Sequence, residues 1–215
     1  MSKKQKERQI ILASGSPRRG EILANAGVAF TVMVTNTDEH AAGAVTPEDY
    51  VSAISMRKAE AAAVAVDSKP FVIIAADTMV VIDGVLLGKP RDRADARAML
   101  KRLENKWHQV LTCLTIAYDQ NGSVHYRQNV CMSCVKFKPL GDTEIEAYLD
   151  TPEPYDKAGA YGIQGMASAF VEKIEGSRDN VIGLPLDTLM GMLSDIPANA
   201  QDFKPAPPQP ALSPL

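Results

Sequence analysis

A turn near the N-terminus has residue types that bind anions. Ser14-Gly15-Ser16-Pro17 interrupts a short apolar segment, and Arg18 and Arg19 follow directly. Ser16 is a good N-cap and Pro17 a good first helical residue, so we expect free backbone N–H groups that attract an anion. The helix dipole disfavours positive charge in the first turn, where the two arginines stand. A polyphosphate bound by the guanidinium groups would neutralise that charge. The alternative is a capped helix with solvated arginines.

A carboxylate follows the most apolar segment of the chain. Asp77 and Thr78 come directly after residues 71–76, which have the composition of a central strand. In open α/β sheets, ligands bind outside the carboxyl ends of the strands. An aspartate in that position can hold a metal or orient water. The alternative is a loop carboxylate that caps a turn.

Residues 157–165 form a second candidate for ligand contact. Lys157 opens this segment, three glycines follow within it, and Gln164 stands next to the last of them. Glycine allows the backbone to approach a ligand closely. The alternative is a tight connecting loop. Lys89 and Glu39 carry less weight by themselves, because a single lysine or an acidic pair in a polar loop is usually solvated.

The cysteines and histidines favour structural roles. Cys131 and Cys134 form a C-x-x-C pair inside an extended segment, where residues three apart point to opposite faces. Zinc would also need two further ligands. We therefore interpret the cysteines as reduced and structural, and we interpret His108 and His125 as structural too. The sequence contains no G-x-x-x-x-G-K-[ST] phosphate loop.

The elements that must position these residues alternate between strands and helices. Hairpin signals at Asp83-Gly84 and at 119–122 add antiparallel pairs. We therefore predict an α/β fold with a mixed, partly antiparallel sheet and flanking helices. The expected strands are 10–13, 30–34, 71–76, 79–82, 85–87, 108–118, 124–137 and 167–175, and the expected helices are 17–26, 47–66, 93–103, 142–149 and 185–193.

Length and composition define the domain organisation. The 215 residues suit one folded domain, 10–196, between a basic extension at 1–9 and a Pro-rich tail at 197–215 that we expect to be disordered. A net charge of −3 disfavours a nucleic-acid polymer as partner. No apolar run is long enough to span a membrane, and no signal-peptide pattern appears, so we expect a cytoplasmic protein.

Taken together, four motifs in this order resemble the Maf (septum formation inhibitor) family over about residues 10–196. Each motif is modest alone, and their order makes the resemblance specific. One departure is visible, because 104–107 stand where the family usually has a Ser-Gly pair before His108. The motifs are Leu12-Ala13-Ser14-Gly15-Ser16-Pro17-Arg18-Arg19, Ala76-Asp77-Thr78 with Leu87-Gly88-Lys89-Pro90, residues 156–165, and Gly183-Leu184-Pro185-Leu186.

The resemblance implies an elongated, two-lobed fold with a central cleft, similar to inosine triphosphate pyrophosphatases. It implies hydrolysis of dTTP or UTP, and of modified pyrimidine nucleotides, to a monophosphate and pyrophosphate with Mg²⁺ or Mn²⁺. Relatives are often described as dimers, so a homodimer is expected. Two alternatives remain open: a 7-methyl-GTP pyrophosphatase, and a non-catalytic, nucleotide-binding regulator of cell division.

The resemblance also assigns roles by position. Asp77 matches the family's general base, and Glu39 with Asp77 matches its metal site. The specificity positions of the dTTP/UTP branch correspond to Arg18, Thr78 and Gln164. The residues that match the lining of the cleft are Ser14, Arg18, Lys58, Lys89 and Gln164.

Overall fold

The computed structural model describes residues 9–38, 41, 43, 46–67 and 70–197. Within them, seven strands form one mixed sheet in the order β2-β1-β3-β5-β6-β7, and β4 pairs with β3. β1 is parallel to β2 and β3, and the other pairs are antiparallel. The predicted fold class is therefore confirmed. The strands are β1 (Gln9–Leu12), β2 (Thr31–Val32), β3 (Phe71–Ile82), β4 (Val85–Leu87), β5 (Trp107–Gln120), β6 (Ser123–Phe137) and β7 (Val171–Glu175).

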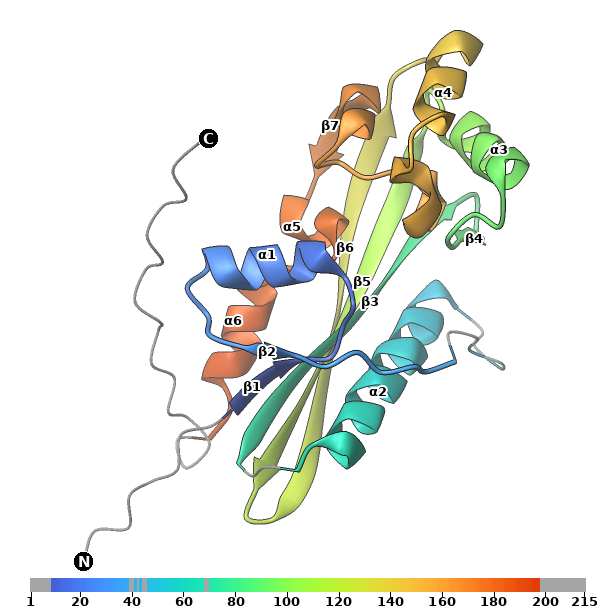
Figure 1. Cartoon of the computed structure of the whole chain (residues 1–215). Helices are drawn as coiled ribbons and strands as arrows, with labels where there is room; N and C mark the ends of the chain where they lie inside the picture. Colours follow the sequence, from blue (N-terminus) through green and yellow to red (C-terminus); the bar gives the residue numbers. More distant parts are fainter. Residues whose placement is uncertain (1–8, 39–40, 42, 44–45, 68–69, 198–215) are drawn as a thin grey trace, which may run out of the picture.

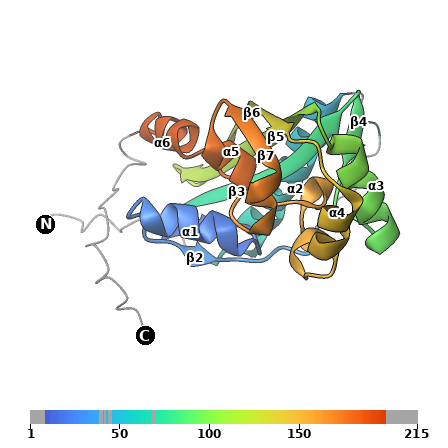
Figure 2. The ribbon, with the colours of Figure 1, turned by 90° about the horizontal axis from the view of Figure 1, so that it is seen from above.

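The helices gather at the two ends of three long strands, β3, β5 and β6 (Figure 1). The lower lobe carries α1 (Pro17–Asn25), α2 (Pro47–Ala65) and α6 (Leu186–Ser194). The upper lobe carries α3 (Arg93–Leu103) and α4 (Asp142–Leu149), which pack together at one end when seen from above (Figure 2). Shorter turns are α5 (Arg178–Ile182) and the 3₁₀ helices η1 (Glu153–Asp156), η2 (Ala158–Ala160) and η3 (Met166–Phe170).

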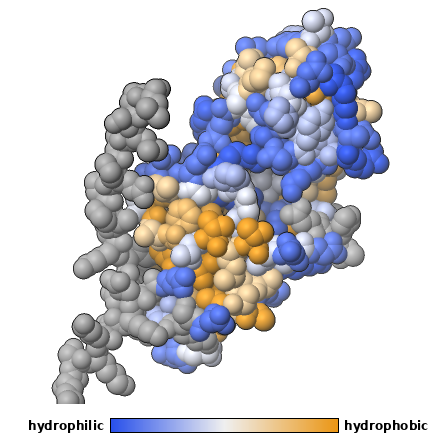
Figure 3. Space-filling view, in the orientation of Figure 1, coloured by the Kyte–Doolittle hydropathy of each residue, from blue (hydrophilic) through white to orange (hydrophobic). Residues whose placement is uncertain are grey.

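Alternating side chains of the long strands build separate cores on the two faces of the sheet. In the lower lobe, Leu12 and Ile74 pack with Leu23 of α1 and Leu189 of α6. Their neighbours in sequence face the other side, where the α2 alanines cover them. Figure 3 shows the resulting surface: the upper lobe is mostly hydrophilic, and apolar atoms gather on the front of the lower lobe.

Local signals in the sequence placed several elements correctly. α2 begins with the predicted Thr46 cap, and Thr46 and Asp49 exchange the two hydrogen bonds of a capping box. The predicted Asp83-Gly84 turn is present, with φ values of 52° and 72°. Both residues have the positive φ of a two-residue hairpin turn, which explains the glycine at the second position.

Four sequence-based predictions were wrong in detail. Asp77 and Thr78 do not follow a strand, because β3 continues through them to Ile82. The expected strand 167–175 begins with η3, and only Val171–Glu175 pairs with β6. β2 has only two residues, and α5 was missed because five residues carry little helical periodicity.

Two other predictions concern the chain ends and membranes. Residues 1–8 and 198–215, which include nearly all of the predicted extension and tail, lie outside the described residues. Among the described residues, no helix is long and apolar enough to cross a membrane.

Candidate active site

A cleft of about 920 Å³ lies between the lobes, within the range of small-molecule sites. Its lining comes from the turn before α1, from the middle of β3, from the segment after β4 and from η1 to Gln164. These segments are far apart in sequence. The structure therefore brings together seven of the eight predicted site residues: Ser14, Arg18, Lys58, Asp77, Thr78, Lys89 and Gln164. Glu39 lies outside the described residues.

A gap in strand pairing explains why the middle of β3 faces the cleft. β1 pairs with β3 only as far as Leu12 opposite Ile74, and β4 begins only at Leu87 opposite Val80. Between these pairings, residues 75–79 have no described strand beside them on this side. Consecutive side chains of a strand point to opposite faces. At this open edge, however, both Asp77 and Thr78 line the cleft.

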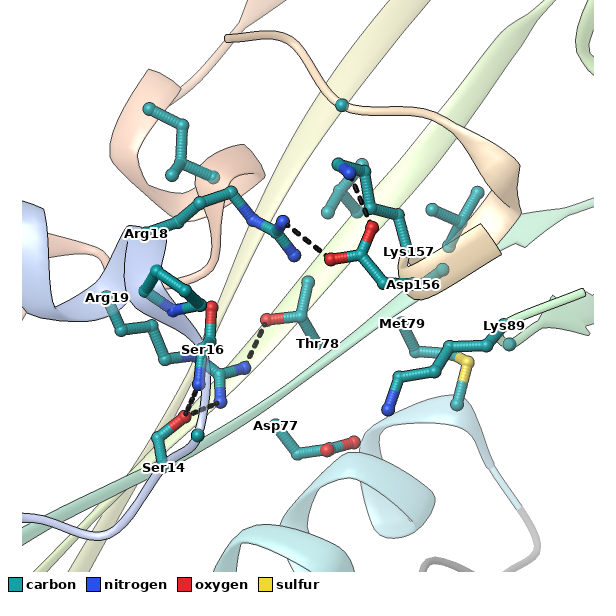
Figure 4. A pocket seen from close by; sticks show the side chains of 18 of the residues that line it. Ser14, Ser16, Arg18, Arg19, Asp77, Thr78, Met79, Lys89, Asp156 and Lys157 are labelled. Atoms are coloured by element: carbon teal, nitrogen blue, oxygen red, sulfur yellow. Dashed lines mark hydrogen bonds and ion pairs between the residues drawn. The ribbon is translucent and has the colours of Figure 1, made fainter. Parts of the chain in front are cut away.

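Asp77 is held by a cation on the floor of the cleft. Lys58 Nζ from α2 donates to Asp77 Oδ1 over 2.8 Å, and both side chains are 12% exposed. Figure 4 shows that the Lys89 ammonium, from the segment after β4, points toward the same region. Two positive side chains therefore flank the Asp77 carboxylate. The two cations can bind a polyanion, and the carboxylate beside them can orient a water molecule.

Arg19 does not have the expected freedom to grip a phosphate. Its side chain is buried and donates to Gly183 O over 2.8 Å and to Ser14 Oγ over 3.0 Å. It also donates to Ala76 O over 2.8 Å and to Thr78 Oγ1 over 3.1 Å. Arg19 therefore binds the backbone at the open edge of β3 and connects three of the sequence motifs. The alternative of solvated arginines therefore does not apply to Arg19, which is buried and bound to protein acceptors although it lines the cleft.

Arg18 instead lies at the rim of the cleft, where it meets an acid from the other lobe. Its guanidinium contacts Asp156 Oδ2 at 3.1 Å, and Lys157 binds the other oxygen (Figure 4). Burial raises the pKa of Asp156, but the hydrogen bonds from Lys157 and Arg18 outweigh it and hold that pKa below the usual value. Asp156 was not among the residues predicted from the sequence, although its position between Arg18 and Lys157 shows that it orders the charges at the rim.

The hydrogen bond that closes the turn before α1 comes from a different serine than expected. Ser16 occupies the N-cap position but makes no capping hydrogen bond with its side chain. The Ser14 hydroxyl accepts from the Ser16 backbone N–H over 3.2 Å instead, and it also receives Arg19. Ser14 thus orders the turn and, at the same time, lines the cleft.

Gln164 lines the cleft from the loop between η2 and η3. It is exposed, it lines the cleft, and its carboxamide makes no hydrogen bond within the described part of the chain. The Gln164 side chain therefore does not close its own loop by hydrogen bonds. A carboxamide offers both a donor and an acceptor to a ligand.

The histidines and cysteines have structural surroundings. His108 is 3% exposed, and its Nε2 lies 2.7 Å from the Tyr161 hydroxyl. Burial lowers the pKa of His108 to about 4, against a backbone hydrogen bond at Lys106 that raises it. His125 stacks on Tyr118. The three cysteines are free, and no cluster of three or more potential metal ligands occurs among the described residues.

The metal-binding groups of the described residues suit a divalent cation only when a substrate supplies further oxygen ligands. Asp77 supplies one carboxylate to the cleft. Mg²⁺ is commonly bound by one or two carboxylates together with phosphate oxygens of a substrate. The described residues therefore fit a cation that arrives with a polyphosphate, and they do not form a cage that would hold one alone.

Comparison with known proteins gives a consistent result. The model of the Maf-like protein family matches residues 9–196. A protein of Symbiobacterium thermophilum named dTTP/UTP pyrophosphatase is 46% identical over 186 residues, which cover 86% of this chain and 93% of that protein. A protein of Vibrio cholerae with the same name is 47% identical over 178 residues, covering 83% and 92%.

Proposed function

The chain belongs to the Maf-like protein family, and we propose that it is a nucleoside triphosphate pyrophosphatase that hydrolyses dTTP and UTP to the monophosphate and pyrophosphate. One observation carries this proposal. The open edge of β3 places Asp77 in a cleft whose other charged side chains are mainly cationic, namely Arg18, Lys58, Lys89, Arg91 and Lys157. The names of the relatives supply the substrate class, and the cleft supplies groups that suit it.

The proposed reaction is an in-line attack of water on the α-phosphorus. A new bond forms between the water oxygen and phosphorus, the bond to the bridging oxygen breaks, and pyrophosphate leaves with that oxygen. Asp77 orients the water and accepts its proton, while Lys58 fixes the carboxylate through Oδ1. Arg18 and Lys89 neutralise the charge that develops on the leaving pyrophosphate.

A divalent cation, Mg²⁺ or Mn²⁺, belongs to this proposal. When bound, it would neutralise phosphate charge and polarise the phosphoryl oxygens. Asp77 would hold it from the described part of the chain, and Glu39 is the further carboxylate that we propose from the family resemblance.

Gln164 is the proposed reader of the base. The edge of thymine or uracil presents an imide N–H flanked by carbonyls, and a carboxamide complements both kinds of group. Cytosine presents an amino group in place of one carbonyl, so one polar group would remain unpaired. Arg18 and Thr78 would complete the specificity site, and they lie in the same cleft. We place the activity in the cytoplasm, where nucleoside triphosphates are available.

Product analysis tests the proposed function. The protein is incubated with Mg²⁺ and dTTP, UTP, CTP, GTP or 7-methyl-GTP, and the nucleotide and phosphate products are separated and quantified. We expect dTMP or UMP with an equal amount of pyrophosphate. In ¹⁸O-labelled water, the label should enter the monophosphate, because water attacks the α-phosphorus.

Each rival gives a different product pattern. Formation of UDP and orthophosphate would overturn the proposed bond cleavage. A preference for 7-methyl-GTP would overturn the proposed branch, and binding without any product would favour the non-catalytic regulator.

A further inference from the structure

The orientation of Gln164 must come from its loop. Its carboxamide makes no hydrogen bond within the described residues, so only the backbone of the loop can fix where the carboxamide points. This loop lies between η2 and η3. What holds the start of η3 therefore also holds Gln164.

A carboxylate behind the cleft holds that loop. Glu153 Oε2 accepts from the Met166 backbone N–H over 2.8 Å, and Oε1 accepts from the Ala167 N–H over 3.4 Å. The Tyr148 hydroxyl donates to Oε1 over 3.2 Å. Burial and the Glu153 charge raise the pKa of Tyr148, so this hydroxyl keeps its proton at neutral pH. Glu153 does not itself line the cleft.

The two glycines around Gln164 fit closely against this anchor. A Cβ at Gly165 would lie 2.3 Å from Glu153 Oε2. A Cβ at Gly162 would lie 2.7 Å from Lys157 Cε, and Lys157 Nζ donates to the Glu153 carbonyl over 2.7 Å. The backbone on both sides of Gln164 thus passes so near to the side chains of Glu153 and Lys157 that a Cβ at either glycine would displace them.

We propose that Glu153 is a positioning residue for base recognition. It acts through the backbone of Met166 and Ala167 to aim the Gln164 carboxamide at the base. This inference rests on the proposed function and deepens it. It predicts that loss of Glu153 impairs the distinction between uracil and cytosine, and not merely the stability of the lobe.

The test compares kcat/KM for UTP and CTP in the full-length chain. Glu153→Ala removes both carboxylate oxygens and the three hydrogen bonds that they accept, and we expect the ratio of UTP to CTP to fall about tenfold, as for loss of one well-placed polar contact. Glu153→Gln keeps an acceptor oxygen and should retain part of the ratio. Glu144→Gln changes an exposed acid of the same lobe, and it should leave the ratio unchanged.

A double-mutant cycle separates positioning from a general structural effect. In a Gln164→Ala background, Glu153→Ala should change the ratio no further, because the group that it aims is already absent. Thermal unfolding of each variant shows whether it is folded. Should Glu153→Ala unfold, Glu153→Gln carries the same test.

The outcomes distinguish the two proposals. If Glu153→Ala lowers kcat/KM equally for UTP and CTP, or if the effects of the two substitutions on the ratio are additive, the role of Glu153 is overturned while the proposed function stands. Absence of any preference for UTP over CTP in the unmodified protein would overturn base recognition by Gln164 and the role of Glu153, and absence of UMP and pyrophosphate as products would overturn the proposed function.

Discussion

Lys58 Nζ and Asp77 Oδ1 lie 2.8 Å apart on the floor of the cleft, and each side chain is only 12% exposed. The lysine comes from the middle of α2, and the aspartate comes from the middle of β3. The contact therefore fixes the helix to the open edge of the sheet. It also sets the direction in which the carboxylate presents its second oxygen.

Replacing Lys58 by Met should reduce turnover without unfolding the protein. The aliphatic stem is retained, but the charge-assisted hydrogen bond to Asp77 is lost, and such a bond contributes about 1.5–3 kcal/mol. We expect kcat for UTP to fall roughly 10- to 150-fold. Lys58→Arg keeps the charge, so its kcat should fall less. Equal turnover in wild type and Lys58→Met would show that the ion pair does not support catalysis.

Replacing Gln164 by Ala should remove the preference for uracil and thymine. Leaving one polar group of a buried base edge unpaired costs roughly 1–3 kcal/mol, or about 5- to 150-fold in kcat/KM. We expect dTTP and UTP to lose most of their advantage over CTP and GTP, with an unchanged melting temperature. If the ranking of the four nucleotides stays the same, the pocket selects by size alone.

His108 should make folding sensitive to mild acid. Its pKa is about 4 in the folded protein, below the ordinary value of about 6.5. Between these values the unfolded chain binds a proton that the folded chain does not. The free energy of unfolding therefore falls as the pH drops from about 6.5 to 4, by about 3 kcal/mol in all.

Urea unfolding at several pH values measures this effect. His108→Gln should be less stable overall, but it should lack this part of the pH dependence. The exposed His125 is the matched control, and His125→Gln should retain the full slope. The same slope in all three proteins would show that His108 is not responsible.

Removal of residues 197–215 should have little effect. The family match ends at residue 196, and Ile196 is already buried against the core of the lower lobe. We expect the melting temperature and the turnover of UTP to remain nearly unchanged. A marked decrease in either quantity would show that the tail contributes to the folded domain.

Local patterns in the sequence predicted most elements, because their signals are local. The capping pair Thr46 and Asp49 and the Asp83-Gly84 turn each depend on a few neighbouring residues. The path of β3 could not be predicted in the same way. Asp77 and Thr78 interrupt an apolar run, and only their pairing with Cys113 and Thr112 of β5 shows that the strand continues.

The residues of the site could be predicted from the sequence, but the contacts among them could not. Motif resemblance selected Asp77, Lys89 and Gln164, and the structure places them in one cleft. The difference between two adjacent arginines was not predictable. Arg19 is buried by contacts with Gly183 and Thr78, more than 50 residues away, and Arg18 remains at the rim.

The proposed release of pyrophosphate from dTTP or UTP depends on Asp77 more than on any other residue of the cleft. Asp77→Asn keeps the shape of the side chain and removes its charge, and its product formation can be measured beside wild type in a coupled pyrophosphate assay with Mg²⁺. Loss of a general base reduces the rate about 100-fold or more, so we expect rapid pyrophosphate release by wild type and at least this decrease in kcat for the variant. A folded Asp77→Asn protein with the turnover of wild type would show that Asp77 is not the general base.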